Sequence, residues 1–343
     1  SKKFQNIIIL EKNNSFGLET SSRNSGVLHA GIYYKKNSLK SKFCKTGNKL
    51  LSEYAKERKI GYKNCGKLIV ASNSEEDLKL KDLLQNAIKN NIKLEYLNKK
   101  ESIKLEPQLN CFSSLISETT AIIDVHELMN NLIIDIQNNN GILVYNSEVD
   151  RIIEKNKCLE FNLKGEKKKF KTKFIINCAG IFALELISKI QSFNKKYIPK
   201  INLFKGDYFR LDGISPFKRL IYPIPCQNSL GIHSTINLNN ETVFGPDEQL
   251  IKNFSYKISN KKQKKFTSSI VKYWPEITSR TIHPDYSGIR TSSLSNDFII
   301  QTNINHNIPG LINLLGINSP GLTCSLAIGK YIAQEVFNSS KLI

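Results

Sequence analysis

Residues 21–34 read SSRNSGVLHAGIYY, and this stretch says more about the fold than any other part of the chain. It combines small hydroxyl side chains, one Arg, glycines, one His and two Tyr. Glycine lets a backbone approach a ligand closely, and several polar groups can converge on that ligand. We therefore interpret 21–34 as the edge of a cofactor and substrate site rather than as an ordinary connection.

A short apolar run, residues 7–10, precedes this stretch and is followed by Glu11. The pattern predicts a strand that ends in a carboxylate, which is how a dinucleotide-binding fold holds the ribose hydroxyls of an adenine nucleotide. Glu11 is therefore the candidate ribose ligand. The alternative is an ordinary carboxylate at the end of a strand.

Hydrophobic periodicity and turn residues predict an α/β fold, α+β overall, in which segments of two domains interleave. We expect a Rossmann-like nucleotide-binding domain made of 1–72, 118–190 and 286–343, and a mixed β-sheet substrate domain made of 73–117 and 191–285. The expected helices are 39–59, 74–90, 99–105, 125–138, 181–189, 262–273 and 323–337. The expected strands are 7–10, 65–72, 94–97, 142–149, 151–154, 158–163, 169–172, 174–177, 207–211, 220–223, 231–235, 242–245 and 311–314, with 117–124 extended.

The chain has a formal net charge of +20, which raises the question of nucleic-acid binding. Only seven of its basic residues are Arg, and the many Lys are spread evenly along the chain. Guanidinium groups are the usual readers of phosphates and bases, so we exclude a nucleic-acid partner. Attraction of an anionic dicarboxylate or of a membrane surface is a milder consequence of the charge.

No apolar run approaches the roughly 18 residues that a membrane-spanning helix needs. The seven Cys are widely spaced and include no CxxC pair, so we expect no metal site and a reducing compartment. Cys178 and Cys324 lie in apolar surroundings and are expected to be small core residues. We expect a cytoplasmic protein, with peripheral association at the inner membrane as an open alternative and with no prediction of oligomeric state.

The chain resembles the L-2-hydroxyglutarate dehydrogenase family of the D-amino-acid-oxidase-like FAD oxidoreductases. The resemblance runs collinearly over nearly the whole chain, through the stretch at 21–34 and the following motifs: LK (39–40), CGKLIVA (65–71), INCAG (176–180), FKGDY (204–208), IYPIP (221–225), GIH (231–233), GIR (288–290) and SPGLTCSLAIG (319–329).

The family begins with a strand, a GxGxxG turn and a helix, whereas no such turn precedes Glu11 here. We interpret residues 1–5 as the end of that helix and expect roughly 25 preceding residues in a longer protein. The alternative is a natural protein that lacks the phosphate loop. Without such a turn, the chain is expected to bind FAD weakly or not at all, and stoichiometric flavin absorbance would overturn that expectation.

The resemblance implies a set of FAD contacts. Residues 21–25 should line the pyrophosphate and the edge of the isoalloxazine, while the backbone of Val149 should meet the adenine. Residues 316–323 open the last helix, whose amides would face the flavin O2/N1 edge, where negative charge appears on reduction. The family more often carries an Ala-Pro-Ser-Pro-Ala-like sequence there, so substrate identity is less certain. The expected FAD ligands are Glu11, Ser21, Ser22, Arg23, Asn24, Ser25, Val149, Ala179, Gly180, Gly288, Gly316, Ser319, Gly321, Leu322 and Thr323.

Oxidation of a 2-hydroxy acid requires a base for the hydroxyl proton while hydride leaves C2 for flavin N5. A His suits that role because its unperturbed pKa is about 6.5. We expect His233 to be the base or an orienting group, with His29 beside the flavin, although either could be structural. Arg290 is the candidate for the substrate carboxylate, with bracing of the flavin as its alternative. The expected further substrate contacts are Lys205, Tyr208, Tyr222 and Asn318.

The resemblance thus implies FAD-dependent oxidation of a 2-hydroxy acid, foremost L-2-hydroxyglutarate to 2-oxoglutarate, with quinone or oxygen as electron acceptor. One alternative is an amine or amino-acid oxidase of the same superfamily, which a substrate panel with an ammonia assay would separate. The other is a remnant without flavin.

Overall fold

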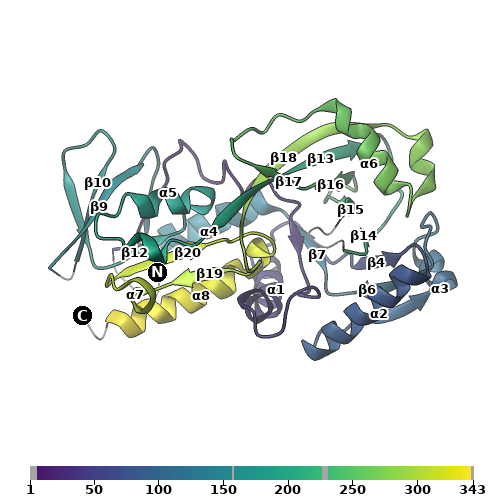
Figure 1. Cartoon of the computed structure of the whole chain (residues 1–343), viewed down its shortest axis with the longest axis horizontal. Coiled ribbons are helices and arrows are strands. Elements are labelled where there is room, and N and C mark those ends of the chain that lie inside the picture. Colours follow the sequence, from purple (N-terminus) through teal and green to yellow (C-terminus); the bar gives the residue numbers. More distant parts are fainter. Residues whose placement is uncertain (1–5, 157, 226–230, 341–343) are drawn as a thin grey trace.

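The computed structural model of the chain describes residues 6–156, 158–225 and 231–340. The sequence-based interpretation of residues 1–5 as the end of a helix lies outside these residues. The molecule has two parts side by side along its long axis (Figure 1). One holds most of the small sheets and the C-terminal helix, and the other holds a large mixed sheet. The two parts and their helices confirm the predicted mixed α/β class.

The large sheet has nine strands in the order β17-β13-β16-β15-β14-β4-β6-β5, and β18 also pairs with β13. Its β14–β4 pair is parallel and its other pairs are antiparallel. The strands are β4 (Lys67–Ala71), β5 (Glu95–Asn98), β6 (Ser113–Ser117), β13 (Ile201–Leu211), β14 (Leu220–Pro223), β15 (His233–Ile236), β16 (Thr242–Gly245), β17 (Gln249–Ile251) and β18 (Ile282–Ser293).

One face of this sheet is apolar and packs against α6 (Gln263–Ile270) and the residues that follow it. Side chains of a strand alternate between the two faces, so every second residue enters this core. Fully buried members of the core include Leu68, Val70, Phe209, Phe244 and Trp274. The intervening residues point to the opposite face, where the candidate site lies.

The described residues also form four small sheets, most of which lie in the other part (Figure 1). The parallel pairs β1–β8 and β12–β20 are typical of nucleotide-binding folds, whose ligands lie beyond the carboxyl ends of such strands. The strands are β1 (Ile8–Leu10), β8 (Ile142–Val144), β12 (Ile175–Asn177), β20 (Leu311–Leu315), β19 (Ile299–Gln301), β9 (Val149–Lys155), β10 (Cys158–Leu163), β11 (Lys169–Thr172), β2 (Val27–Leu28), β7 (Ala121–Ile123) and β3 (Tyr62–Lys63).

The first and last long helices, α1 (Leu39–Glu57) and α8 (Gly321–Ser340), pack against each other. A Cβ on Gly47 would lie 2.2 Å from the carbonyl oxygen of Thr323, so only glycine permits this approach. The contact fixes the first turn of α8. The other helices are α2 (Ser74–Lys89), α3 (Lys99–Leu105), α4 (Val125–Asn138), α5 (Ala183–Ser188) and α7 (Asn303–His306).

Several predicted elements differ in detail. The predicted strand 142–149 is wrong in its extent, because it stops at Val144 before Asn146, whose φ of 53° breaks an extended chain. Residues 149–155 instead form the single strand β9. The expected core position of Cys324 is confirmed, whereas that of Cys178 is wrong, since this residue is exposed after the end of β12. The domain boundaries stay a prediction, and both β4 and β18 belong to the large sheet.

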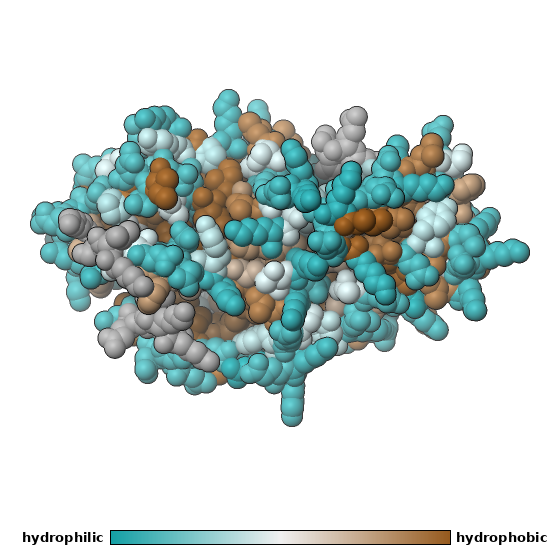
Figure 2. All heavy atoms as spheres, turned by 90° about the horizontal axis from the view of Figure 1, so that it is seen from below, coloured by the Kyte–Doolittle hydropathy of each residue, from teal (hydrophilic) through white to brown (hydrophobic). Residues whose placement is uncertain are grey.

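The face of the molecule shown in Figure 2 is covered mainly by hydrophilic side chains, with apolar ones visible between them. Among the residues the structure describes, no helix is both long and apolar enough to span a bilayer.

Candidate active site

A row of polar and aromatic side chains lies on the face of the large sheet opposite α6. Lys67 pairs with Leu220 of β14. Two residues further along β14, the ring of Tyr222 stacks on His233 with 3.8 Å between ring centroids. His233 lies opposite Gly245 of β16, where a Cβ would be 2.9 Å from the Tyr208 ring. The register therefore gathers side chains from four strands on one face.

Arg290 joins this face from β18. It pairs with Phe204 of β13, and its guanidinium lies 2.6 Å from where a Cβ on Gly206 would be. Glycine at 206 thus leaves room for the guanidinium. Burial lowers the pKa of His233, and the positive charge of Arg290 lowers it further. Burial raises the pKa of Tyr208, and the charge of Arg290 opposes that rise. No carboxylate among the described residues forms an ion pair with Arg290, so its charge is available to an anion.

His29, a residue of the stretch at 21–34, is held against the start of the last helix. Its backbone N–H donates to the Thr323 hydroxyl at 3.0 Å, and its Nε2 lies 3.2 Å from the Ser319 hydroxyl. Its Nδ1 is buried without a hydrogen-bond partner. Burial, followed by the charges of Lys67 and His233, holds the pKa of His29 well below its usual value. His29 is therefore a neutral imidazole with one unused nitrogen.

His233 is also buried and neutral. Its Nδ1 lies 3.1 Å from the carbonyl oxygen of Gly231, so the tautomer that satisfies this carbonyl donates from Nδ1 and leaves the Nε2 lone pair free. Burial lowers the pKa of His233 to about 3, with smaller contributions from the charges of Lys67 and Arg290. The structure brings both predicted histidines together with Arg290, Tyr208 and Tyr222, and it supplies a neutral acceptor for a proton.

The loop at 21–25 lies against β18. Thr20 donates to the carbonyl of Ile289 at 3.0 Å, and a Cβ on Gly288 would lie 2.3 Å from the carbonyl oxygen of Arg23. Gly288 is thus required for close approach of this loop, whatever it does for a cofactor. The Arg23 guanidinium lies 3.9 Å from the Tyr256 ring centroid.

The side chains of this loop largely form hydrogen bonds within the loop or are exposed to solvent. Asn24 donates to the carbonyl of Ser21 at 2.6 Å and accepts from the backbone N–H of Gly26, which shapes the turn. Ser21 and Ser22 are exposed and Ser25 is half-buried. Direct FAD contacts by residues 21–25 stay a prediction.

The start of α8 faces the same region. Gly316, at a φ of 64°, ends β20, and Gly321 donates to the carbonyl of Asn318 at 2.6 Å. Within the described part of the chain, the backbone N–H groups of Leu322 and Thr323 have no acceptor. The side-chain oxygen Oδ1 of Asn318 is buried without a partner. This end of the helix therefore presents both donors and an acceptor.

A second group of predicted residues meets at the carboxyl ends of β1 and β12. Glu11 accepts from the backbone N–H of Asn13 at 2.9 Å, and Lys12 lies 3.0 Å from the Phe182 ring centroid. Gly180, at a φ of 57°, is exposed, and a Cβ there would meet nothing within 4 Å. Ala179 precedes it and donates to the Asn177 side chain. The backbone of Val149 is predicted to meet the adenine, and its carbonyl accepts from Lys189 at 3.1 Å.

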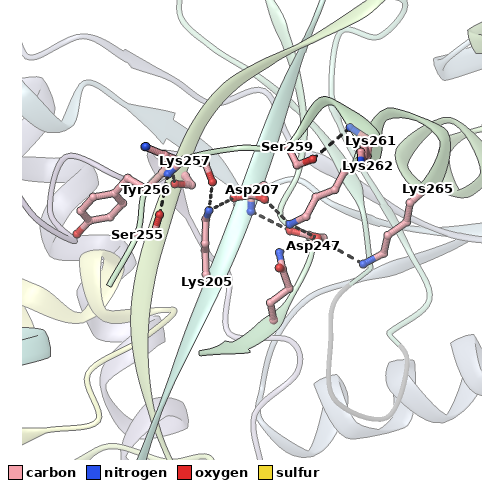
Figure 3. Close-up of polar contacts among 12 residues, drawn as sticks. Lys205, Asp207, Asp247, Ser255, Tyr256, Lys257, Ser259, Lys261, Lys262 and Lys265 are labelled. Carbon is pink, nitrogen blue, oxygen red and sulfur yellow. Dashed lines mark hydrogen bonds and ion pairs between the residues drawn. The ribbon is translucent and has the colours of Figure 1, made fainter. Parts of the chain in front are cut away.

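The structure does not bring Lys205 to the site. Alternation along β13 places Lys205 and Asp207 on the α6 side of the sheet, away from Arg290. Lys205 pairs with Asp207 at 3.3 Å and donates to the carbonyl of Lys257. Figure 3 shows this network, in which Lys262 joins Asp207 to Asp247. An ammonium that already has two partners does not support the predicted contact with substrate.

Lys67 belongs to the site but was not predicted from the sequence, and Tyr33 was predicted only as part of the stretch 21–34. Lys67 is 0% exposed, and its ammonium lies 4.7 Å from the Tyr33 ring centroid and 4.6 Å from that of Tyr222. The signal that could have revealed it is a Lys at the head of the apolar run 67–71, because a lysine in a buried strand is rare.

These residues fit FAD, which carries polar groups at both ends. The open, exposed turn at Gly180 and the carboxylate of Glu11 suit its nucleotide end. The unpartnered Asn318 oxygen, the His29 nitrogen and the free amides of α8 suit a ring edge that both donates and accepts. Among the described residues, no group of His, Cys, Asp and Glu is arranged to hold a metal ion.

Comparison with known proteins agrees with this fit. A family model described as FAD dependent oxidoreductase, DAO, matches residues 1–335. The chain is 37% identical to a mitochondrial L-2-hydroxyglutarate dehydrogenase of Arabidopsis thaliana, over 98% of this chain and 79% of that protein. It is 28% identical to a glycerol 3-phosphate dehydrogenase of Caloramator mitchellensis, over 100% of this chain and 71% of that protein.

Among solved structures, the chain resembles the dithionite-reduced L-alpha-glycerophosphate oxidase of Mycoplasma pneumoniae with FAD bound. The TM-score is 0.85 at 27% identity, over 94% of this chain and 85% of that one. These matches confirm the predicted family, fold and cofactor. The chain belongs to the DAO family of FAD dependent oxidoreductases and is an FAD-dependent oxidoreductase.

Proposed function

We propose that the protein oxidises L-2-hydroxyglutarate, or a closely similar 2-hydroxy acid, to the 2-oxo acid. The observation that carries the proposal is the Arg290 guanidinium, which forms no ion pair with a described carboxylate, on the same sheet face as a neutral histidine, His233. The identity to the Arabidopsis thaliana dehydrogenase supports this substrate class.

Arg290 would bind the carboxylate next to the reacting carbon. Its planar fork matches a carboxylate with two parallel hydrogen bonds, and no ion pair within the described chain competes for it. A carboxylate fixed in this way orients the 2-hydroxyl group beside it. Tyr208, stacked on Tyr286 with 4.3 Å between ring centroids, would form one wall.

The reaction also needs a proton acceptor. When bound, FAD supplies the acceptor for the hydride that leaves C2. The hydroxyl proton would pass to Nε2 of His233, which burial keeps neutral and which the Gly231 carbonyl orients through Nδ1. Hydrogen bonds to Ser319 and Thr323 would fix His29 beside the start of α8.

A substrate panel tests the proposal. FAD-loaded protein would be incubated with L-2-hydroxyglutarate, its D-enantiomer, L-glutamate and glycerol 3-phosphate, with a quinone analogue or oxygen as acceptor. We expect 2-oxoglutarate from the L-hydroxy acid and no ammonia. Ammonia from L-glutamate would favour the amino-acid oxidase alternative, and preferential oxidation of glycerol 3-phosphate would favour the activity named for the Caloramator mitchellensis relative.

A further inference from the structure

Lys67 is a buried cation without an anion. Its side chain is fully buried at the head of β4, yet no described residue gives its ammonium a hydrogen bond or an ion pair. Its ammonium instead lies over the faces of two aromatic rings, those of Tyr33 and Tyr222. A buried charge lowers the free energy of unfolding unless it is paired. The protonated Lys67 therefore destabilises the ligand-free fold.

The polar groups around Lys67 are also incomplete. The hydroxyl oxygens of Tyr33 and Tyr222 are buried without a hydrogen-bond partner, and so is Nδ1 of His29. The Thr235 hydroxyl lies near that of Tyr222 but completes no hydrogen bond with it. In native proteins nearly all buried polar atoms form hydrogen bonds. Several such atoms without a partner around one cation therefore indicate a ligand whose oxygens complete these hydrogen bonds.

Among the described residues, the groups that contact or electrostatically influence Lys67 include no carboxylate. They include His29, Tyr33, Cys44 of α1, Tyr222 and His233. Burial lowers the pKa of Lys67 to about 7, and only the Cys44 thiol opposes this change. In the free protein this amine is therefore only partly protonated near pH 7, and a bound anion would favour its protonated, charged form.

We infer that Lys67 binds the second, distal carboxylate of a dicarboxylic 2-hydroxy acid, with the hydroxyl groups of Tyr33 and Tyr222 donating to the same carboxylate. This inference rests on the proposed function, in which Arg290 binds the first carboxylate. With two unpaired cations on one sheet face, the site matches a dianion. Lys67, and not Lys205, then selects a dicarboxylate over a monocarboxylate.

Lys67 does not serve as the base in this arrangement. A bound carboxylate favours the protonated ammonium, so the lysine is charged in the complex, whereas a base must be neutral there. The two histidines provide neutral nitrogens in the same cluster.

The test is a Lys67→Met variant of the FAD-loaded protein, since Met keeps an unbranched side chain that is one atom shorter and removes the charge. Lys63→Met is the matched control, because Lys63 lies four positions earlier and bonds only to Asn240. We would measure KM and kcat for L-2-hydroxyglutarate and for L-2-hydroxybutyrate, which lacks the distal carboxylate. Binding of glutarate, an unreactive dicarboxylate, would be measured by calorimetry.

We expect Lys67→Met to raise KM for L-2-hydroxyglutarate about 100-fold, with a smaller change in kcat, and to change kcat/KM for L-2-hydroxybutyrate far less. Glutarate binding should weaken by the same factor. In the wild-type protein, glutarate affinity should fall as the pH rises through 7, because Lys67 loses its proton there. This last measurement needs no variant.

An unchanged KM and an unchanged glutarate affinity in Lys67→Met would overturn the inference and leave the proposed function standing. A glutarate affinity that stays constant through pH 7 in the wild type would also overturn it. If the wild type binds glutarate through Lys67 but does not oxidise L-2-hydroxyglutarate, the inference stands and the proposed function fails.

Discussion

His29 and Thr323 hold each other across 294 positions of sequence: the backbone N–H of His29 donates to the Thr323 hydroxyl at 3.0 Å. The same hydroxyl donates to the carbonyl of Val27 at 3.2 Å. One side chain of the last helix thus fixes the stretch that begins the site. The adjacency supports the idea that a flavin ring lies between these two segments.

Thr323→Val should remove both of these hydrogen bonds and slow catalysis. Valine keeps the shape but removes the hydroxyl, so the buried N–H of His29 and carbonyl of Val27 lose their partner. We expect a loss of about 1–2 kcal/mol in the free energy of unfolding and a lower kcat. Ser325→Ala is the control, because the Ser325 hydroxyl in the same helix is buried without a partner. An equal change in the free energy of unfolding of both variants, measured by denaturant titration, would contradict the role assigned to the Thr323 hydroxyl.

His233→Gln should lower kcat by about 10²–10⁴-fold, because it removes the proton acceptor. Since the pKa of His233 is about 3 in the free protein, the neutral form prevails at all higher pH. Acidification from pH 8 to 5 should therefore not reduce kcat/KM through this residue. A pH profile whose acid limb is centred near 6.5, and absent from His233→Gln, would show that His233 is not held neutral.

Arg290→Lys should raise KM more than it lowers kcat, because lysine keeps the charge but not the planar fork. We expect roughly a 10-fold to 100-fold rise in KM, and a larger one for Arg290→Ala. Steady-state kinetics of the FAD-loaded protein would measure both. If Arg290→Ala left KM and kcat unchanged, this residue would not be part of the substrate site.

Gly288→Ala should push the loop at 21–25 away from β18. The new Cβ would lie 2.3 Å from the carbonyl oxygen of Arg23, which is backbone and cannot turn aside. We expect weaker retention of FAD, measured by flavin fluorescence after gel filtration. Gly329→Ala is the matched control, because nothing lies within 4 Å of its Cβ and alanine suits the interior of α8. That change should stabilise the protein by about 0.5–1 kcal/mol.

Lys67→Met should make the ligand-free protein more stable at low pH. The pKa of Lys67 is about 7 in the fold and 10.5 as a model group, so the fold disfavours its protonated form. The cost is complete below pH 7 and fades as the pH rises toward 10.5. We expect a gain of a few kcal/mol at pH 6 that shrinks by pH 9.5, measured by urea unfolding. A less stable variant at pH 6 would show that the charge is compensated in the fold.

The sequence predicted most helices and the buried strands because their periodicity is strong and local. It missed β18, whose His283, Pro284, Asp285 and Gly288 are poor strand formers. The strand exists because eleven residues of β13 provide a long partner, and such a pairing is invisible to a local pattern.

Those residues of the site that lie in a recognisable sequence motif could be predicted. His29, His233, Arg290 and Tyr222 were found through their motifs, and the structure places them on or beside one sheet face. The face of Lys205 could not be known without the register of β13, and a shift of one residue reverses which side a strand residue occupies. Lys67 was overlooked because its strand reads as apolar.

The most direct test of the central claim is anaerobic mixing of the FAD-loaded protein with L-2-hydroxyglutarate, followed by visible absorbance. We predict that the flavin absorbance bleaches and that one equivalent of 2-oxoglutarate forms per flavin, with no change for the D-enantiomer. Unaltered absorbance with L-2-hydroxyglutarate, together with bleaching by glycerol 3-phosphate or by an amino acid, would contradict it.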